Sequence, residues 1–165
     1  MIVLGVDPGS HATGFGAIAT GPVVCMLGGG VIRTKSSAPL PERLLAIHEG
    51  ISGAIAEFKP DVLAVEDLFN AKNARSSLIL GHARGVILLA GAGVGVSVAE
   101  YAPREIKQAL TGNGGATKEQ VRFMVMRLLG LKETPALDLS DALAVALAHS
   151  GRAQLGKKLS RKIEG

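Results

Sequence analysis

Short apolar runs that end in polar residues alternate along this chain with longer segments of helical period. Residues 2–6 form an apolar run rich in β-branched side chains, and Pro8-Gly9 stops the run just after Asp7. This pattern predicts a buried strand that ends in a turn. Residues 13–20 and 23–34 form two further extended runs. Three neighbouring strands with short links predict an antiparallel meander.

The next segment changes its period. Over residues 40–58 the apolar positions recur at three- and four-residue steps, as on one face of a helix. Residues 62–65 form a second fully apolar run, which also ends in acids, Glu66 and Asp67. A strand after a crossover helix usually lies parallel to the preceding strand in the same sheet. We therefore expect Asp7 and Glu66 to emerge at the same edge.

The second half of the chain predicts one more strand among helices. Residues 77–90 are apolar nearly all round, which indicates a helix buried on more than one side and, in a small domain, a subunit interface. We expect a strand over residues 94–100 and a short helix over 103–110. A capping box at Thr117 opens another helix, and the last helix is expected over 139–149. The order predicts an α/β chain with a five-stranded mixed sheet flanked by helices.

Composition adds limits to this picture. The chain has 165 residues, of which 47% are hydrophobic, so it suits a single domain with a sizeable core. We expect that domain to span residues 1–151. The single cysteine, Cys25, lies in an apolar run, so we expect a buried thiol in a reducing cytoplasm and exclude internal disulfides. The N-terminus leads directly into a strand, which predicts that there is no signal peptide.

The formal charge of +4 is concentrated at the end of the chain. Residues 152–165 hold five basic side chains and one acidic one, which equals the whole excess. We interpret this segment as a basic C-terminal tail, whose order the sequence leaves open. Such a tail suits binding to nucleic acid, and it equally suits solubility.

Acidic residues stand at the ends of several predicted elements: Asp7 and Glu66 at strand ends, and Asp138 and Asp141 at the start of the last helix. Each has an ordinary explanation, because Asp starts turns and acids cap helices. Brought together, four carboxylates would repel one another unless cations lay between them. Oxygen ligands favour hard ions such as Mg²⁺. Paired metals about 3.5–4 Å apart are the usual device for phosphodiester hydrolysis.

At this point the chain resembles a known family. The order of elements resembles the ribonuclease H-like fold, and the motifs resemble the RuvC family, the bacterial crossover (Holliday) junction endodeoxyribonucleases. The first motif alone is weak, whereas all of them in order are highly specific and cover nearly the whole chain. They are Leu4-Gly5-Val6-Asp7-Pro8-Gly9 with Thr13-Gly14-Phe15-Gly16, Val65-Glu66-Asp67-Leu68-Phe69 with Ala71-Lys72-Asn73, Leu80-Gly81-His82-Ala83-Arg84-Gly85, Tyr101-Ala102-Pro103 through Lys107, and Asp138-Leu139-Ser140-Asp141-Ala142-Leu143-Ala144.

The resemblance implies a mechanism and a setting. Asp7, Glu66, Asp138 and Asp141 match the catalytic acids of the family and would hold two Mg²⁺ ions per subunit, with Mn²⁺ as a substitute and Asp7 as the bridging ligand. The family works as a cytoplasmic homodimer that makes two symmetric nicks in a four-way DNA junction, in recombination and repair. The nicks leave 5′-phosphate and 3′-hydroxyl ends, and a branch-migration motor is the partner.

The resemblance also implies DNA contacts. Phe69 follows the catalytic strand and would stack on a splayed base at the junction centre, unless it only packs at the start of the next helix. Lys107 and Lys118 match basic positions that would hold phosphates. The loop nearest the cut adds further candidates, each of which can instead be a solvated side chain: Lys72, Asn73, Arg75 and Ser76.

Asp67 departs from the uncharged residue that is more common in the family. Strand alternation points it away from the face of Glu66, so we assign the ligand role to Glu66 and leave a contribution of Asp67 open. We expect His149, at the end of the last helix, to cap carbonyl groups.

Two other functions fit the same fold. An ATP-binding phosphotransferase of the actin and sugar-kinase type shares the Asp-x-Gly strand-turn, but those proteins need two such domains and this chain has one. A non-catalytic nucleic-acid-binding scaffold is disfavoured by the intact acidic set, because four buried carboxylates without metal would cost stability. The sequence gives neither the preferred cleavage sequence nor the preferred metal.

Overall fold

A computed structural model describes the backbone of residues 1–67 and 74–163 and the side chains of residues 1–67 and 74–153. Its elements, in chain order, are β1 (Ile2–Asp7), β2 (Ala12–Ala19), β3 (Cys25–Arg33), α1 (Leu40–Phe58), β4 (Val62–Glu66), α2 (Ala74–Gly93), β5 (Ser97–Tyr101), α3 (Pro103–Thr111), α4 (Lys118–Leu129) and α5 (Leu137–Ile163).

The strands form one mixed sheet in the order β3-β2-β1-β4-β5. β1 pairs antiparallel with β2, and β2 pairs antiparallel with β3, which confirms the predicted meander. β1 pairs parallel with β4, and β4 pairs parallel with β5, so the crossover through α1 returns the chain to the same sheet. The predicted five-stranded α/β architecture is therefore confirmed, with β1 at its centre.

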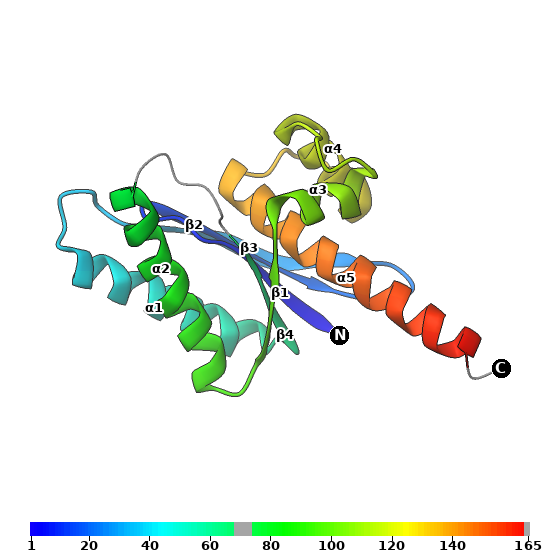
Figure 1. The fold of residues 1–165 in the computed structure, drawn as a ribbon, viewed down its shortest axis with the longest axis horizontal. Helices are drawn as coiled ribbons and strands as arrows, with labels where there is room; N and C mark the ends of the chain where they lie inside the picture. Colours follow the sequence, from blue (N-terminus) through cyan, green and yellow to red (C-terminus); the bar gives the residue numbers. More distant parts are fainter. Residues whose placement is uncertain (68–73, 164–165) are drawn as a thin grey trace.

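Helices cover both faces of the sheet (Figure 1). On one face α1 and α2 pack over a core that includes Leu4, Val6 and Ile87. On the other face α3, α4 and α5 pack over a core that includes Val3 and Leu143. The alternation of Val3, Leu4 and Val6 between the two cores follows from the two-residue period of a strand. The central strand is thus buried on both sides, and its end is where it meets solvent.

α5 lies directly against the centre of the sheet because small residues line the contact. A Cβ atom on Gly5 would be 2.1 Å from the carbonyl oxygen of Ala142 and 2.9 Å from the Cβ of Ala146. Farther toward the start of α5, a Cβ atom on Gly14 would be 1.9 Å from the carbonyl oxygen of Asp138. This close approach brings the acidic first turns of α5 to the edge of the sheet where β1 ends.

Several helix boundaries follow the sequence pattern. α1 has the predicted bounds, and the capping box at Thr117 is present: its hydroxyl accepts a hydrogen bond from the Gln120 amide at 3.3 Å, and the Gln120 side chain accepts one from the Thr117 amide at 2.9 Å. α2 is longer than expected at both ends. α5 continues through Gly151 to Ile163, so the predicted end at 149 is wrong. One glycine costs only about 1 kcal/mol in a helix, and good helix formers surround it.

Cys25 is exposed, and the prediction of a buried thiol is wrong. It begins β3, which forms the edge of the sheet, and successive residues of this strand alternate between outward and partly buried positions. An edge strand has a neighbouring strand on one side only. Some side chains of an apolar run on such a strand therefore remain exposed.

α2 presents apolar side chains outward. Ala83, Ile87 and Ala90 pack into the core, whereas Leu78 and Leu89 are 65% and 61% exposed. Within the chain α2 is thus buried on one side only, in contrast to the expectation of burial on more than one side. By length and composition this helix could also cross a membrane, and it is the one helix of the described residues with that property.

Candidate active site

The carboxyl ends of β1 and β4 meet at one edge of the sheet. The parallel register pairs Val6 with Val65, so the next residues, Asp7 and Glu66, lie side by side as the crossover predicted. A cavity of about 270 Å³ opens there, lined by Asp7, Glu66, Pro103, Ile106, Lys107, Lys118, Val121, Asp141 and Ala144. We call it the acidic cavity. It unites Asp7, Glu66 and Asp141 with both predicted phosphate-binding lysines.

The Asp7 and Glu66 carboxyl groups share a hydrogen bond. The pKa of Asp7 is raised to about 9, mainly by burial and in addition by the hydrogen bond with Glu66 and the charges of Glu66 and Asp141. Burial also raises the pKa of Glu66, while the hydrogen bond from Asp7 opposes that rise. Two carboxyl groups in such contact hold one proton between them, because two adjacent buried negative charges repel. The pair thus favours positive charge in the cavity.

Lysine side chains provide positive charge at the border of the cavity. The Lys118 ammonium group donates a hydrogen bond to Oδ2 of Asp141 at 3.0 Å, with the lysine side chain 70% exposed and the Asp141 side chain 22% exposed. The hydrogen bond and the charge of Asp141 raise the pKa of Lys118. The charges of Lys107 and Lys118 lower the pKa of Glu66 against the effect of burial. These cations are placed to attract a phosphate beside the acids.

Asp138 lies in the first turn of α5 and is half-buried. Its backbone covers Gly14, which is the residue that β2 pairs with Asp7. Asp138 is therefore one strand away from Asp7, but it is absent from the residues that line the acidic cavity. The predicted set of four acids thus divides into three that share the cavity and one beside it.

The donor set fits a hard divalent cation in its chemistry. Carboxylate oxygens of Asp7, Glu66 and Asp141 face one cavity, and Mg²⁺ takes a few carboxylates and completes its shell with water. Among residues 1–67 and 74–153, no three acidic, histidine or cysteine side chains are already arranged around a common point for a metal. The contacts explain this, because Asp7 hydrogen-bonds to Glu66 and Asp141 pairs with Lys118. A cation would take the place of the shared proton and of the ammonium contact.

The structure describes only some of the predicted DNA-binding residues. Phe69, Lys72 and Asn73 lie outside the described residues. Arg75 is exposed near the start of α2, and Lys107 is half-buried on α3.

Sequence reasoning missed a cluster on the other face of the sheet. Nη2 of Arg84, on α2, lies 3.0 Å from Oδ1 of Asp67 and also contacts Oε2 of Glu100. Asp67 indeed points away from Glu66, as strand alternation predicted. A signal was present in the sequence, because Arg84 is the one charged residue (Asp, Glu, Lys or Arg) between positions 76 and 99.

His149 has a different role from the predicted cap. Because α5 continues past it, His149 lies inside the helix, and its Nδ1 is 2.7 Å from the Tyr101 hydroxyl group. Burial lowers the pKa of His149, and the charge of Arg152 lowers it further.

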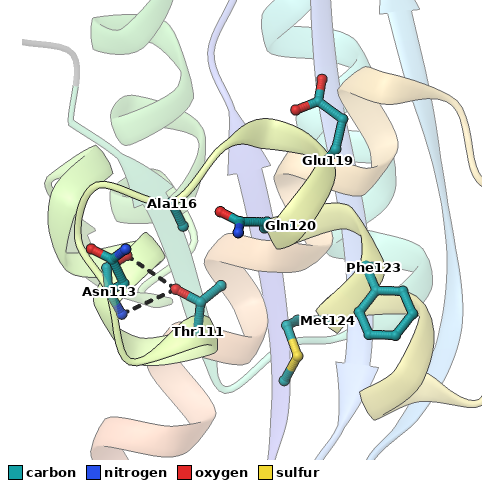
Figure 2. A pocket seen from close by; sticks show the side chains of 7 residues that line it. All are labelled: Thr111, Asn113, Ala116, Glu119, Gln120, Phe123 and Met124. Atoms are coloured by element: carbon teal, nitrogen blue, oxygen red, sulfur yellow. Dashed lines mark hydrogen bonds between the residues drawn. The ribbon is translucent and has the colours of Figure 1, made fainter.

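A second cavity, of about 560 Å³, lies beside the start of α4 (Figure 2). It is lined by Thr111, Asn113, Ala116, Glu119, Gln120, Phe123 and Met124. Thr111 and Asn113 hydrogen-bond to each other at 3.0 and 3.1 Å, which shapes the loop at its rim. Although this cavity is larger, it lacks the paired carboxyl groups. We therefore place the candidate active site at the acidic cavity.

Comparisons with known sequences identify the proteins that this chain resembles. A family model described as "Crossover junction endodeoxyribonuclease RuvC" matches residues 3–149. The protein of that name from Tolumonas auensis is 48% identical over 165 residues, which cover 99% of this chain and 95% of the relative. The one from Proteus mirabilis is 49% identical over 149 residues, which cover 90% of this chain and 86% of the relative.

Solved structures give the same result. "T. thermophilus RuvC in complex with Holliday junction substrate" superimposes with a TM-score of 0.90 at 40% identity and covers 94% of this chain and 96% of that one. The yeast mitochondrial Holliday junction resolvase Ydc2 matches with a TM-score of 0.66 at 14% identity, over 94% of this chain and 80% of that one. At that identity it shares the fold alone.

Proposed function

The chain belongs to the RuvC family of crossover junction endodeoxyribonucleases, and we propose that it resolves four-way DNA junctions by hydrolysing phosphodiester bonds at the acidic cavity. One observation carries the proposal: Asp7, Glu66 and Asp141 line a single cavity with Lys107 and Lys118. Carboxylates to hold cations and ammonium groups to hold phosphate are the two parts that phosphodiester hydrolysis needs. Family membership and this cavity disfavour both a phosphotransferase and a non-catalytic scaffold.

The acids are proposed to hold the metal of this family. Asp7, Glu66, Asp138 and Asp141 would hold two Mg²⁺ ions per subunit, with Mn²⁺ as a substitute. When bound, such ions activate a water molecule and stabilise the leaving oxygen. Asp138 would join the set from the first turn of α5, where its backbone covers the residue that pairs with Asp7.

The reaction that fits this site breaks the bond between phosphorus and the 3′ oxygen. The oxygen of water joins phosphorus, and the 3′ oxygen leaves as a hydroxyl group after it takes a proton. Lys107 and Lys118 bind the phosphate beside the acids and orient it. The products carry 5′-phosphate and 3′-hydroxyl ends.

A homodimer is proposed with α2 at its interface. Leu78 and Leu89 are exposed on this helix, and exposed apolar surface of this kind marks association sites. A two-fold dimer places two acidic cavities symmetrically, which suits two symmetric nicks in a junction with the same symmetry. A branch-migration motor as partner, a bacterial cytoplasmic location and a role in recombination and repair complete the proposal.

The DNA contacts and the domain limits stay proposals as well. Phe69 would stack on a base, and Lys72, Asn73 and, at the start of α2, Arg75 would touch the DNA backbone. The nuclease domain would span residues 1–151. The basic segment 152–165 would add electrostatic attraction to DNA.

The test uses synthetic four-way junctions with labels on each strand. With Mg²⁺ or Mn²⁺ we expect paired nicks at symmetric positions and no cutting of linear duplex. Asp7→Asn should abolish cutting and keep junction binding, whereas Glu57→Gln, an exposed change on α1, should alter neither. If the parent protein leaves junctions intact with both metals, the proposed function is wrong; if Asp7→Asn still cuts, the assignment of Asp7 is wrong.

A further inference from the structure

Arg84 joins two acids that stand at the ends of neighbouring strands. Its Nη2 contacts Oδ1 of Asp67 at 3.0 Å and Oε2 of Glu100. The side chains of Asp67, Arg84 and Glu100 are 26%, 28% and 41% exposed, so the cluster is partly shielded from water. Without the guanidinium group, two carboxylates would face each other across β4 and β5.

The cluster is connected to the catalytic edge through the backbone. The Asp67 amide donates a hydrogen bond to the Tyr101 carbonyl oxygen at 2.8 Å, which extends the β4–β5 ladder one residue beyond Glu66. In the same ladder Glu66 pairs with Tyr101. The position of Glu66 therefore depends on how firmly β4 and β5 are held together at their ends.

Side-chain alternation separates the cluster from the acidic cavity. Asp67 and Glu100 reach Arg84 on the face that α2 covers, while Glu66 faces the acidic cavity beside α3 and α5. Arg84 does not line that cavity. Arg84 can act on the site only by holding β4, the strand that carries Glu66, against β5.

We propose that Arg84 is a positioning residue, which aligns Glu66 for catalysis by clamping the ends of β4 and β5 through Asp67 and Glu100. The expected effect of Arg84 on the cleavage rate rests on the proposed junction-cleaving function. Partly exposed ion pairs contribute little to global stability, so the consequence of losing Arg84 is local. Arg84 also lies on the helix proposed for the dimer interface, and thereby links that surface to the catalytic edge.

The experiment compares Arg84→Met with the parent protein in two measurements. In amide hydrogen exchange, the segment over residues 62–67 should exchange faster by about tenfold, an effect within the range for coupled networks, while β1 should not change. In single-turnover cleavage at saturating junction, the rate should fall by about the same factor, with junction binding in metal-free buffer unchanged. Arg127→Met, on the exposed end of α4, is the matched control.

Compensating variants separate positioning from general damage. Arg84→Lys should restore part of the rate and of the exchange protection, because the positive charge remains. Asp67→Asn with Glu100→Gln, added to Arg84→Met, should also restore both in part, because the repulsion is removed. Unchanged exchange over residues 62–67 in Arg84→Met, or no recovery in either compensating variant, would overturn the proposal. The exchange result stands by itself even if the parent protein does not cut junctions.

Discussion

Gly14 and Asp138 touch through their backbones: a Cβ atom on Gly14 would lie 1.9 Å from the Asp138 carbonyl oxygen and 2.5 Å from its carbonyl carbon. Gly14 is paired with Asp7 in the sheet. This contact therefore fixes the distance between the first turn of α5 and the end of the central strand, and with it the spacing of the acids that the two elements carry.

The first prediction concerns Gly14→Ala. The added methyl group has to push the start of α5 away from β2, because the atom it meets is backbone. We expect a loss of about 1–3 kcal/mol in the free energy of unfolding, as for other overpacked sites, and a severe loss of junction cleavage. Urea denaturation and a cleavage assay measure the two effects. Gly53→Ala is the control, since nothing lies within 4 Å of its Cβ and α1 should gain up to about 1 kcal/mol.

The second prediction concerns Asp7 without metal. Its pKa is raised from 3.8 to about 9 by burial and by Glu66, so the folded state prefers the protonated form. The stabilisation is complete below the ordinary pKa and is lost as pH rises toward the folded one. Asp7→Asn should therefore be more stable than the parent in chelator, by more than about 1.4 kcal/mol near neutral and alkaline pH, and the difference should grow with pH. Equal unfolding curves at about pH 8 would contradict it.

The third prediction concerns divalent metal. A cation that binds only the folded chain stabilises it by mass action, about 1.4 kcal/mol at a tenfold excess over its dissociation constant. We expect Mg²⁺ or Mn²⁺ to raise the melting temperature of the parent and of Glu57→Gln. Asp7→Asn should lose most of that rise. A rise of equal size in Asp7→Asn would mean that the ions bind elsewhere.

The fourth prediction concerns the exposed apolar face of α2. Leu89 is 61% exposed, and a charge there has to be desolvated if the face is an interface. Leu89→Glu should convert a dimer into a monomer in sedimentation at micromolar concentration. Phe123→Glu, a similarly exposed site on α4, should leave the association unchanged. A parent protein that sediments only as a monomer would contradict the proposed dimer.

The fifth prediction concerns His149. Burial lowers its pKa below 6.5, so the unfolded chain takes up a proton at a higher pH than the folded chain. Stability should therefore decrease as pH falls below about 6.5. The effect should stay under about 1 kcal/mol because the ring is only half-buried and solvent screens it. His149→Asn should flatten this part of the pH profile in urea denaturation, with His82→Asn, on the exposed face of α2, as the control.

Local patterns in the sequence determined most of the elements and the edge of the sheet at which Asp7 and Glu66 meet. The apolar run before Asp7 and the Pro8-Gly9 stop define β1, and the period of residues 40–58 defines α1. The parallel crossover then puts Asp7 and Glu66 at one edge. These inferences succeed because strand and helix periods, turns and caps are properties of neighbouring residues.

Tertiary structure alone decided which side chains meet. The contacts of Lys118 with Asp141 and of Arg84 with Asp67 and Glu100 join residues that are 16 to 23 positions apart in the sequence. Cys25 is exposed because β3 forms an edge, although its neighbours are apolar. Such features depend on strand order, on the close approach of α5 and on the burial that results. The periodicity of the sequence does not predict these contacts and exposures, because packing depends on the whole chain at once.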